Sequence, residues 1–272
     1  MTGIAVHPMR FRLRTSVLVA VASLLGFVGF VWPFFLQPHG TENQAHAADA
    51  PWLFVLVLPL LLAVVLAELS DGAIDSKAIA VLGVLTACGA ALRLPSTGVT
   101  GFTPLFFLLL PAGRVFGRGF GFVLGALTMF TSALLTGGVG PWLPFEMFGS
   151  AWVGFFAGCL PPARGRAEIF MLAAYGAVAG LVYGLLLNLW FWPFGASAAS
   201  NLRYVAGAPV TENLQRFWAF HVTTSLGFDI PRAVGNAALV LIAGHPVLAA
   251  LRRAARRASF GSVAEFVGPP VT

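Results

Sequence analysis

The chain has 272 residues, of which 58% are hydrophobic and only 10% are charged, and it contains 31 glycines and 25 phenylalanines. This composition excludes a disordered chain, a fibrous protein and an ordinary soluble domain, and it is typical of a membrane protein. Eight spans of about 20 residues each would use roughly 160 residues, which leaves no room for a sizeable soluble domain.

The few charged residues are mostly basic, with 16 Lys and Arg against 10 Asp and Glu and a formal net charge of +6. In a chain this apolar, the excess is better interpreted as a membrane-orientation signal than as a nucleic-acid surface. The only lysine, Lys77, is followed by Ala78 and does not stand in the Gly-Lys-Ser/Thr loop that holds nucleotide phosphates. We therefore expect neither a P-loop ATPase nor a nucleic-acid partner.

Sequence patterns of enzymes are missing. The chain has no GxSxG elbow, no HExxH zinc motif and no paired carboxylates at catalytic spacing. Cys88 and Cys159 stand in apolar segments without a CxxC pattern, so we expect small buried side chains and not metal or redox groups. The sequence predicts no catalytic residue, no metal site and no cofactor.

Apolar runs mark the expected transmembrane helices. The fourth run is short and contains Pro104 and Pro111, so a re-entrant turn competes there with a full crossing. The eight predicted spans are 16–36, 52–69, 78–94, 102–116, 119–136, 142–160, 168–192 and 230–251.

The distribution of positive charge favours eight full crossings with both termini in the cytoplasm. A re-entrant fourth segment would move the Arg164/Arg166 loop and the C-terminal arginines to the outside. We therefore expect a multi-pass plasma-membrane protein with an N-terminal helix pair in 1–77, a six-helix core in 78–257 and a cytoplasmic tail in 258–272. In this arrangement twelve of the 16 basic residues lie inside: Arg10, Arg12, Arg14, Lys77, Arg114, Arg118, Arg164, Arg166, Arg252, Arg253, Arg256 and Arg257.

The two ends of the chain's membrane region carry further signals. The basic residues from Arg10, the first apolar run and Ala45-His46-Ala47 resemble a signal peptide, but the run is long and the A-x-A pattern lies well beyond it, which favours an uncleaved first helix over cleavage. The aromatic patch Phe217–His221 predicts a short helix on the outer membrane surface. Asp229-Ile230-Pro231 has the pattern of an N-cap with an early proline, so the last span is expected to begin near Ile230.

Small residues recur at a spacing of four in several spans. This spacing places them on one helix face and lets neighbouring backbones approach closely. Packing within the bundle is the first interpretation of each stripe, and contact with another membrane protein is the alternative for one of them. The stripes are Gly83/Ala87/Ala91, Gly117/Gly121/Gly125, Ser150/Gly154/Gly158 and Gly176/Gly180/Gly184.

Polar and aromatic side chains in the predicted spans gather toward the outer side. Polar groups inside a membrane are costly and frequently functional, and a few of them among aromatic walls are typical of a small-molecule pocket. We predict an outward-open pocket at this level. Its predicted substrate-binding residues are Arg93, Trp142, Phe145, Glu146, Asn188, Trp192, Arg232 and Asn236.

Structural interpretations compete for these residues. The tryptophans fit an aromatic belt, and Arg93, at a helix end, fits a side chain that reaches lipid headgroups. Glu146 and Arg232 could form an ion pair with each other. The asparagines could hydrogen-bond between helices, and His221 is expected to be an interfacial histidine.

Four segments carry motifs of a known family: Gly138–Met147 (GVGPWLPFEM), Tyr183–Trp192 (YGLLLNLWFW), Phe228–Asn236 (FDIPRAVGN) and Ala90–Pro95 (AALRLP). Together they resemble the substrate-specific S components of energy-coupling factor (ECF) vitamin transporters. The resemblance covers about residues 78–257 and says little about which substrate is carried.

The resemblance implies an all-α fold, in which a six-helix S-component core is here preceded by two additional transmembrane helices. It also implies that a vitamin-like molecule is bound from the outer side, and that the first core helix docks through Gly83, Ala87 and Ala91 to a transmembrane T component bearing two ATPase subunits. The chain departs from the family in its two additional N-terminal spans. It also has Glu146 where many relatives would have glutamine.

The sequence therefore predicts a non-catalytic subunit of an ATP-driven importer, in contact with membrane lipid, that captures substrate and depends on partners for energy. A proton- or ion-coupled secondary transporter is the alternative, although the ionisable residues lie toward helix ends and no internal repeat is evident. A membrane scaffold or enzyme subunit ranks third. The substrate remains open among cobalamin, thiamine-like and deazapurine-like molecules.

Overall fold

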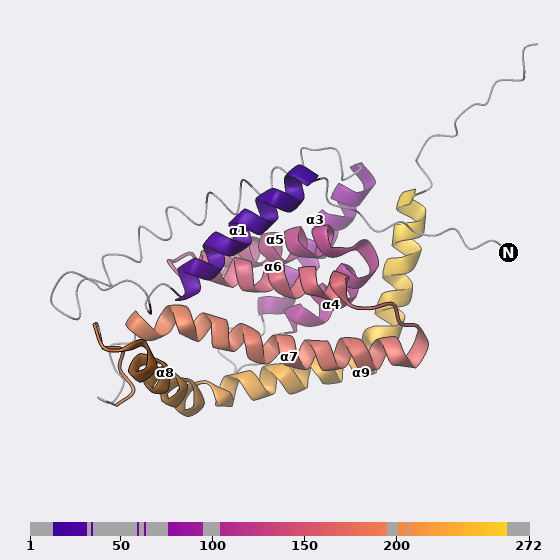
Figure 1. Cartoon of the computed structure of the whole chain (residues 1–272). Helices are drawn as coiled ribbons and strands as arrows, with labels where there is room; N and C mark the ends of the chain where they lie inside the picture. The colour runs from indigo at the N-terminus through magenta and orange to yellow at the C-terminus, as the bar shows by residue number, and fades with distance from the viewer. Residues whose placement is uncertain are drawn as a thin grey trace, which may run out of the picture.

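The computed structural model describes residues 13–31, 76–94, 104–194, 201–205 and 207–259, together with the single positions 34, 59 and 63. Every element in these ranges is helical, which confirms the predicted all-α fold. The elements in chain order are α1 (Leu13–Val31), α3 (Ser76–Arg93), α4 (Leu105–Phe116), α5 (Arg118–Thr136), α6 (Leu143–Cys159), α7 (Gly165–Phe191), η3 (Trp192–Phe194), α8 (Val210–Thr224) and α9 (Leu226–Ser259) (Figure 1).

Seven of the eight predicted spans overlap one helix each. The remaining one, 52–69, lies outside the described residues apart from positions 59 and 63. Within the described part of the chain, three helices are long and apolar enough to cross a membrane: Arg118–Thr136, Gly165–Phe191 and Leu226–Arg256. These helices agree with a multi-pass membrane protein.

The last span begins earlier than the sequence predicts, at Leu226 and not near Ile230. The backbone amides of Phe228 and Asp229 both donate to the carbonyl of Ser225 at 2.9 Å. Ser225, which directly follows α8, therefore opens the helix in place of the predicted N-cap. Asp229 lies inside the first turns of α9, where its carboxylate contacts other side chains.

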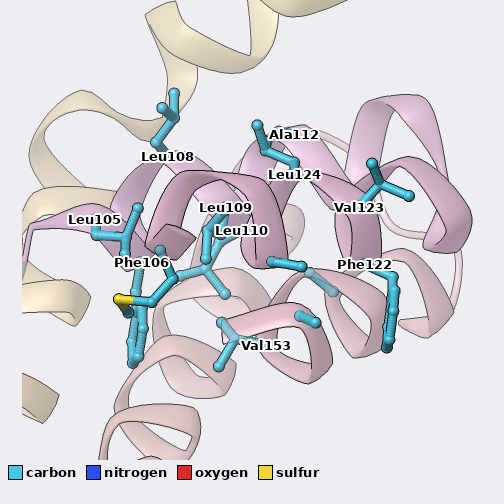
Figure 2. Packing of buried hydrophobic residues seen from close by; sticks show 14 of the residues in the cluster. Leu105, Phe106, Leu108, Leu109, Leu110, Ala112, Phe122, Val123, Leu124 and Val153 are labelled. Carbon is cyan, nitrogen blue, oxygen red and sulfur yellow. The ribbon is translucent and has the colours of Figure 1, made fainter. Parts of the chain in front are cut away.

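The short helix α4 lies at the centre of the bundle. Its 12 residues extend for about 18 Å, which is less than the hydrocarbon thickness. Most of its side chains are buried, and it packs against α5, α6 and α9. Figure 2 shows the apolar side chains of α4 together with Phe122 of α5 and Val153 of α6.

Despite its length, α4 crosses the bundle and does not turn back. Its last turn carries Arg114, whose guanidinium donates to the carbonyl of Leu160 at 2.8 Å, just beyond the end of α6. The helix before it, α3, ends at Arg93, which bonds to Glu146 at the start of α6. Because these contacts lie at opposite ends of α6, α3 and α4 end on opposite sides, as a full crossing requires.

Ion pairs to one buried carboxylate join three helices at the end of the bundle that carries Arg114. Glu168, in the first turn of α7, has a side chain only 2% exposed. It accepts from Arg114 at 2.9 Å and from Arg252 of α9 at 2.7 Å. We call this the basic end. The sequence predicts that the opposite end, with Arg93 and Glu146, faces outward, and we call it the outer end.

The helix α9 bends near the basic end. Figure 1 shows its first part beside α7 and its last part, in yellow, turning away across the end of the bundle. Pro246 lies inside the helix. Proline lacks the amide hydrogen that would bond to the preceding turn and its ring presses on that turn's carbonyl, which bends a helix at this point.

The additional N-terminal helix α1 belongs to the bundle. It packs against α6 and α7. The indole nitrogen of Trp152 donates to Ser23 Oγ at 3.0 Å, and the ring of Phe30 meets that of Phe145 edge-on with centroids 5.0 Å apart. Residues of α1 therefore contribute to the buried core.

Small residues bring α5 and α6 into backbone contact. A Cβ added at Gly121 would collide with the carbonyl of Gly154, and one added at Gly125 would collide with that of Ser150. Such contact is possible only where side chains are absent. The stripes Gly117/Gly121/Gly125, Ser150/Gly154/Gly158 and Gly176/Gly180/Gly184 are thus internal packing faces, as predicted.

The fourth stripe has different surroundings. Gly83, Ala87 and Ala91 of α3 are exposed, and a Cβ added at Gly83 would meet no atom within 4 Å. The opposite face of α3, with Leu82 and Leu85, packs into the bundle. Within the described residues, this stripe has no helix packed against it at Gly83.

The expectation that the two cysteines are buried is wrong. Cys88 and Cys159 are both exposed, on the faces of α3 and α6 that point away from the bundle. Lipid tails are as apolar as a protein core. An apolar sequence context therefore does not separate a lipid-facing side chain from a buried one.

The packing predicts opposite outcomes for two glycine-to-leucine changes. Gly125→Leu should destabilise the protein by about 1–3 kcal/mol or more, because α5 must move away from the backbone of α6. Gly83→Leu should leave stability within about 0.5 kcal/mol, because the added side chain enters open space. Denaturant unfolding of the two purified variants in the same detergent measures both effects, and equal destabilisation would contradict the described α5–α6 contact.

Candidate functional site

The outer end is organised by an ion pair between α3 and α6. Arg93 Nη2 lies 2.8 Å from Glu146 Oε2, and Arg93 Nη1 donates to Ser132 Oγ of α5 at 3.3 Å. The two charged side chains are 18% and 17% exposed. Arg93 thus turns into the bundle, and the interpretation that it reaches lipid headgroups is wrong. The alternative in which Glu146 and Arg232 pair with each other is not realised, because Glu146 binds Arg93 and Arg232 binds Asp229.

Arg232 of α9 forms a second charged group with Asp229 of the same helix. Its Nη1 lies 2.7 Å from Asp229 Oδ1 and 3.3 Å from the carbonyl of Gly180. Its guanidinium carbon lies 5.4 Å from the centre of the Tyr183 ring, within the range of a cation–π contact. The Tyr183 ring in turn packs against Gly149 of α6, about one turn from Glu146, so the two charged groups lie in one cluster around Tyr183.

A histidine extends this cluster toward α8. Asn188 Nδ2 lies 2.8 Å from His221 Nδ1 and also bonds to Ser225. Because an amide nitrogen only donates, His221 Nδ1 accepts, and a neutral ring carries its proton on Nε2. That nitrogen lies 3.8 Å from Asp229 Oδ2. His221 is therefore a buried member of the cluster, bonded to Asn188 of α7.

Asn236 is the most enclosed of the predicted site residues. It stands one turn beyond Arg232 on α9 and is 1% exposed. Neither polar atom of its amide has a hydrogen-bond partner among the described residues, and the same holds for Arg232 Nε and Asp229 Oδ2. Unpartnered buried polar atoms are uncommon in proteins. Asp229, Arg232 and Asn236, three and four residues apart, thus present unfilled hydrogen-bonding capacity from one helix face.

The predicted aromatic residues separate into two groups. Phe145 is buried and stacks on Trp190, with centroids 5.1 Å apart. Trp192 is also buried; its indole nitrogen donates to the carbonyl of Leu202 at 2.7 Å, and its ring meets Phe217 of α8. Trp142 is 43% exposed, as an aromatic-belt residue would be.

The helix α8 lies at the outer end of the α7–α9 pair (Figure 1). Its inward residues Asn213, Phe217, Phe220 and His221 are buried, whereas Trp218 and other apolar residues are exposed. A helix is therefore present where the sequence predicts one, and it is longer than Phe217–His221. It covers the end of the polar cluster that contains Asn188 and Asp229.

The polar cluster is bonded within itself in this structure. Among the described residues, one cavity of about 670 Å³ and another of about 240 Å³ lie elsewhere, and neither is lined by a predicted substrate-binding residue. The larger lies between α1, α6 and α7, and the smaller lies at the basic end. In the part of the chain that the structure describes, no group of three or more His, Cys, Asp or Glu side chains could hold a metal ion.

Sequence reasoning missed several members of the cluster. Tyr183 and Ser132 were not singled out, and Asp229 was taken only as a helix cap. The three-residue spacing of Asp229 and Arg232 could have predicted their ion pair on one helix face. No comparable signal pointed to Ser132, because only the fold brings α5 beside Arg93.

A profile of the family "ECF transporter, substrate-specific component" matches residues 77–244, which is more than half of the chain. The chain belongs to this family. The matched region of the S component runs from α3 into α9 and contains the whole outer-end cluster, whereas α1 precedes it. Comparisons with curated proteins and with solved structures found no match.

Family membership confirms the resemblance read from the sequence motifs. The S component is a substrate-binding membrane subunit of an ECF transporter, and the family consists of transporter subunits and not of enzymes. S components in general associate with a T component and ATPase subunits. The outer-end cluster is the candidate substrate site of this one.

The Arg93–Glu146 ion pair predicts that the effects of changing its two residues on the free energy of unfolding are coupled. Glu146→Gln and Arg93→Gln should each destabilise the protein by about 3 kcal/mol, because each change removes one partner of a largely buried ion pair. The double variant should lose about 1–3 kcal/mol less than the sum of the single changes. Denaturant unfolding of the three variants measures the coupling.

The exposed pair Arg216–Glu212 on α8 provides the control for this cycle. Its coupling should not exceed about 0.5 kcal/mol. Strictly additive effects of the two changes at Arg93 and Glu146 would contradict the described ion pair.

Proposed function

We propose that this S component captures a vitamin-like small molecule from the outer side and delivers it through a T component driven by two ATPase subunits. The proposal rests chiefly on the outer-end cluster. Charged and polar side chains from α3, α6, α7, α8 and α9 converge there, and Asp229, Arg232 and Asn236 retain unfilled hydrogen-bonding capacity. The predicted substrate residues Arg93, Phe145, Glu146 and Asn188 belong to the same end of the bundle.

The substrate would be an aromatic or conjugated molecule with amide-like and partly anionic groups. Arg232 Nε can only donate, Asp229 Oδ2 can accept, and the Asn236 amide can do both. A substrate whose edge carries alternating hydrogen-bond donors and acceptors would satisfy these groups together. Phe145 and Trp190, already stacked on each other, supply aromatic surface at the same end.

Binding would require the cluster to open. The helix α8 is attached to it through the Asn188–His221 contact and through the ring contacts of Phe217 with Trp192. We infer that α8 moves to admit substrate and then closes over it, so that ligand binding selects the closed arrangement. Energy for release would come from the partner ATPases, because the described chain contains no phosphate-binding loop of its own.

Docking to the T component would use the exposed stripe Gly83, Ala87 and Ala91. The other three small-residue stripes are occupied by helix packing within the bundle. A face of small residues lets a partner helix approach closely in lipid. Of the four stripes, this is the one whose glycine has open space beside it among the described residues.

A change at Asn236 separates substrate binding from structural support. Asn236→Leu should lower the amount of small molecule that co-purifies with the protein by at least about tenfold, because a bound ligand loses hydrogen bonds to the amide. Stability without ligand should be unchanged or higher, since an unpartnered buried amide is replaced by an apolar group. Mass spectrometry of the retained ligand and denaturant unfolding give the two readouts.

Asn213→Leu is the matched control, because Asn213 is equally buried but bonds to both backbone groups of Val205. This variant should lose stability and retain ligand. Full ligand retention by Asn236→Leu would contradict the proposed site.

A double change on α3 tests docking. The variant Gly83→Leu/Ala87→Leu should no longer co-purify with the T component and ATPase subunits from native membranes, because bulky side chains prevent close helix approach. Its ligand retention should stay within about twofold of the wild type. Ala174→Leu, on an exposed position of α7, is the control and should assemble normally.

Normal assembly of the double variant would contradict the docking face. Substrate accumulation by the isolated protein in liposomes with only an ion gradient would instead support the secondary-transporter alternative. The buried His221–Asp229 contact would then be the first candidate for the coupling group.

A further inference from the structure

A polar cavity lies at the basic end, far along the bundle from the candidate substrate site. Its volume is about 240 Å³, and it lies between the start of α7 and the last turns of α9. Its polar lining consists of Glu168 from α7 and His245, Arg252, Arg253 and Arg256 from α9, with Gly165 at its edge.

Positive charge dominates this cavity. The one carboxylate in its lining, Glu168, already binds Arg114 and Arg252. Arg253 and Arg256 add two exposed guanidinium groups. The start of α7 at Gly165 has no side-chain cap, so its first amides also favour an anion. The ligand that this chemistry fits is an anion with several acceptor oxygens, and guanidinium groups bind phosphate in this way.

The bend in α9 sets the cavity at the level of lipid headgroups. From Leu226 to Pro246 the helix extends for about 30 Å, which is the thickness of the hydrocarbon core. Beyond Pro246, Leu248, Leu251 and Ala255 are buried against the bundle, whereas the arginines are exposed. A helix with this distribution lies along the membrane surface with its basic face toward phosphates.

We propose that the cavity at the basic end binds the phosphate group of an anionic membrane lipid. Exposed apolar surface continues from the cavity toward the membrane interior, where Ile242 is 80% exposed and stands three residues before His245 on the same side of α9. Acyl chains would lie on this surface while the phosphate binds Arg253 and Arg256. A bound lipid would then join the ends of α7 and α9 at the point where α9 bends.

The test uses the purified full-length protein and two soluble lipids with the same chains, dioctanoyl phosphatidylglycerol and dioctanoyl phosphatidylcholine. Native mass spectrometry should show preferential binding of the phosphatidylglycerol. The double variant Arg253→Gln/Arg256→Gln should bind it at least about tenfold more weakly, because two basic contacts are removed. Unfolding without lipid shows whether each variant is folded.

Lys77→Gln/Arg166→Gln is the control, since it removes two exposed basic residues that do not line the cavity. Its affinity should stay within about twofold of the wild type. Equal weakening in both double variants, or equal binding of the two lipids, would overturn the proposal. Inorganic phosphate is the third probe: stabilisation by phosphate alone, as large as that by phosphatidylglycerol, would overturn the lipid assignment in favour of a free anion.

Discussion

A charged side chain in an apolar bundle must bind an opposite charge, and this requirement shapes both ends of the S component. At the outer end, Arg93 binds Glu146 and Arg232 binds Asp229. At the basic end, Glu168 holds arginines from two other helices. The centre between them is filled by apolar side chains of α4 and its neighbours. Each end is thus a compact polar site, and the two are separated by the thickness of the core.

The ends differ in how completely their polar groups are satisfied. At the basic end, both oxygens of Glu168 accept hydrogen bonds from arginines. At the outer end, the Asn236 amide, Asp229 Oδ2 and Arg232 Nε have no hydrogen-bond partner among the described residues. A fully bonded cluster stabilises the fold, whereas a partly bonded one retains capacity for a ligand. This contrast is the physical reason for placing substrate capture at the outer end.

Much of the fold could be predicted from the sequence, because apolar runs and small-residue stripes report length and close packing directly. The same signals do not show whether a side chain points into the bundle or out toward lipid. Cys88 was expected inside and faces outward, since lipid and core are equally apolar. Arg93 was expected to reach headgroups and turns inward, because its partner Glu146 lies on a helix 53 positions away. The candidate site could therefore be predicted as a set of residues at one level, but its pairing required the three-dimensional structure.

Backbone contacts between helices, such as that of α5 with α6, make parts of the molecule differ in how easily they can move. Where no side chains intervene, there are no rotamers to rearrange, so the backbone contact of Gly121 with Gly154 resists movement of α5 against α6. Gly180 brings α7 similarly close to the backbone of α9 at Ala233, whereas α8 is held to its neighbours by side-chain contacts such as Asn188–His221. Under the proposed function, entry and exit of substrate would then move α8 with His221, while Glu146 stays fixed on α6.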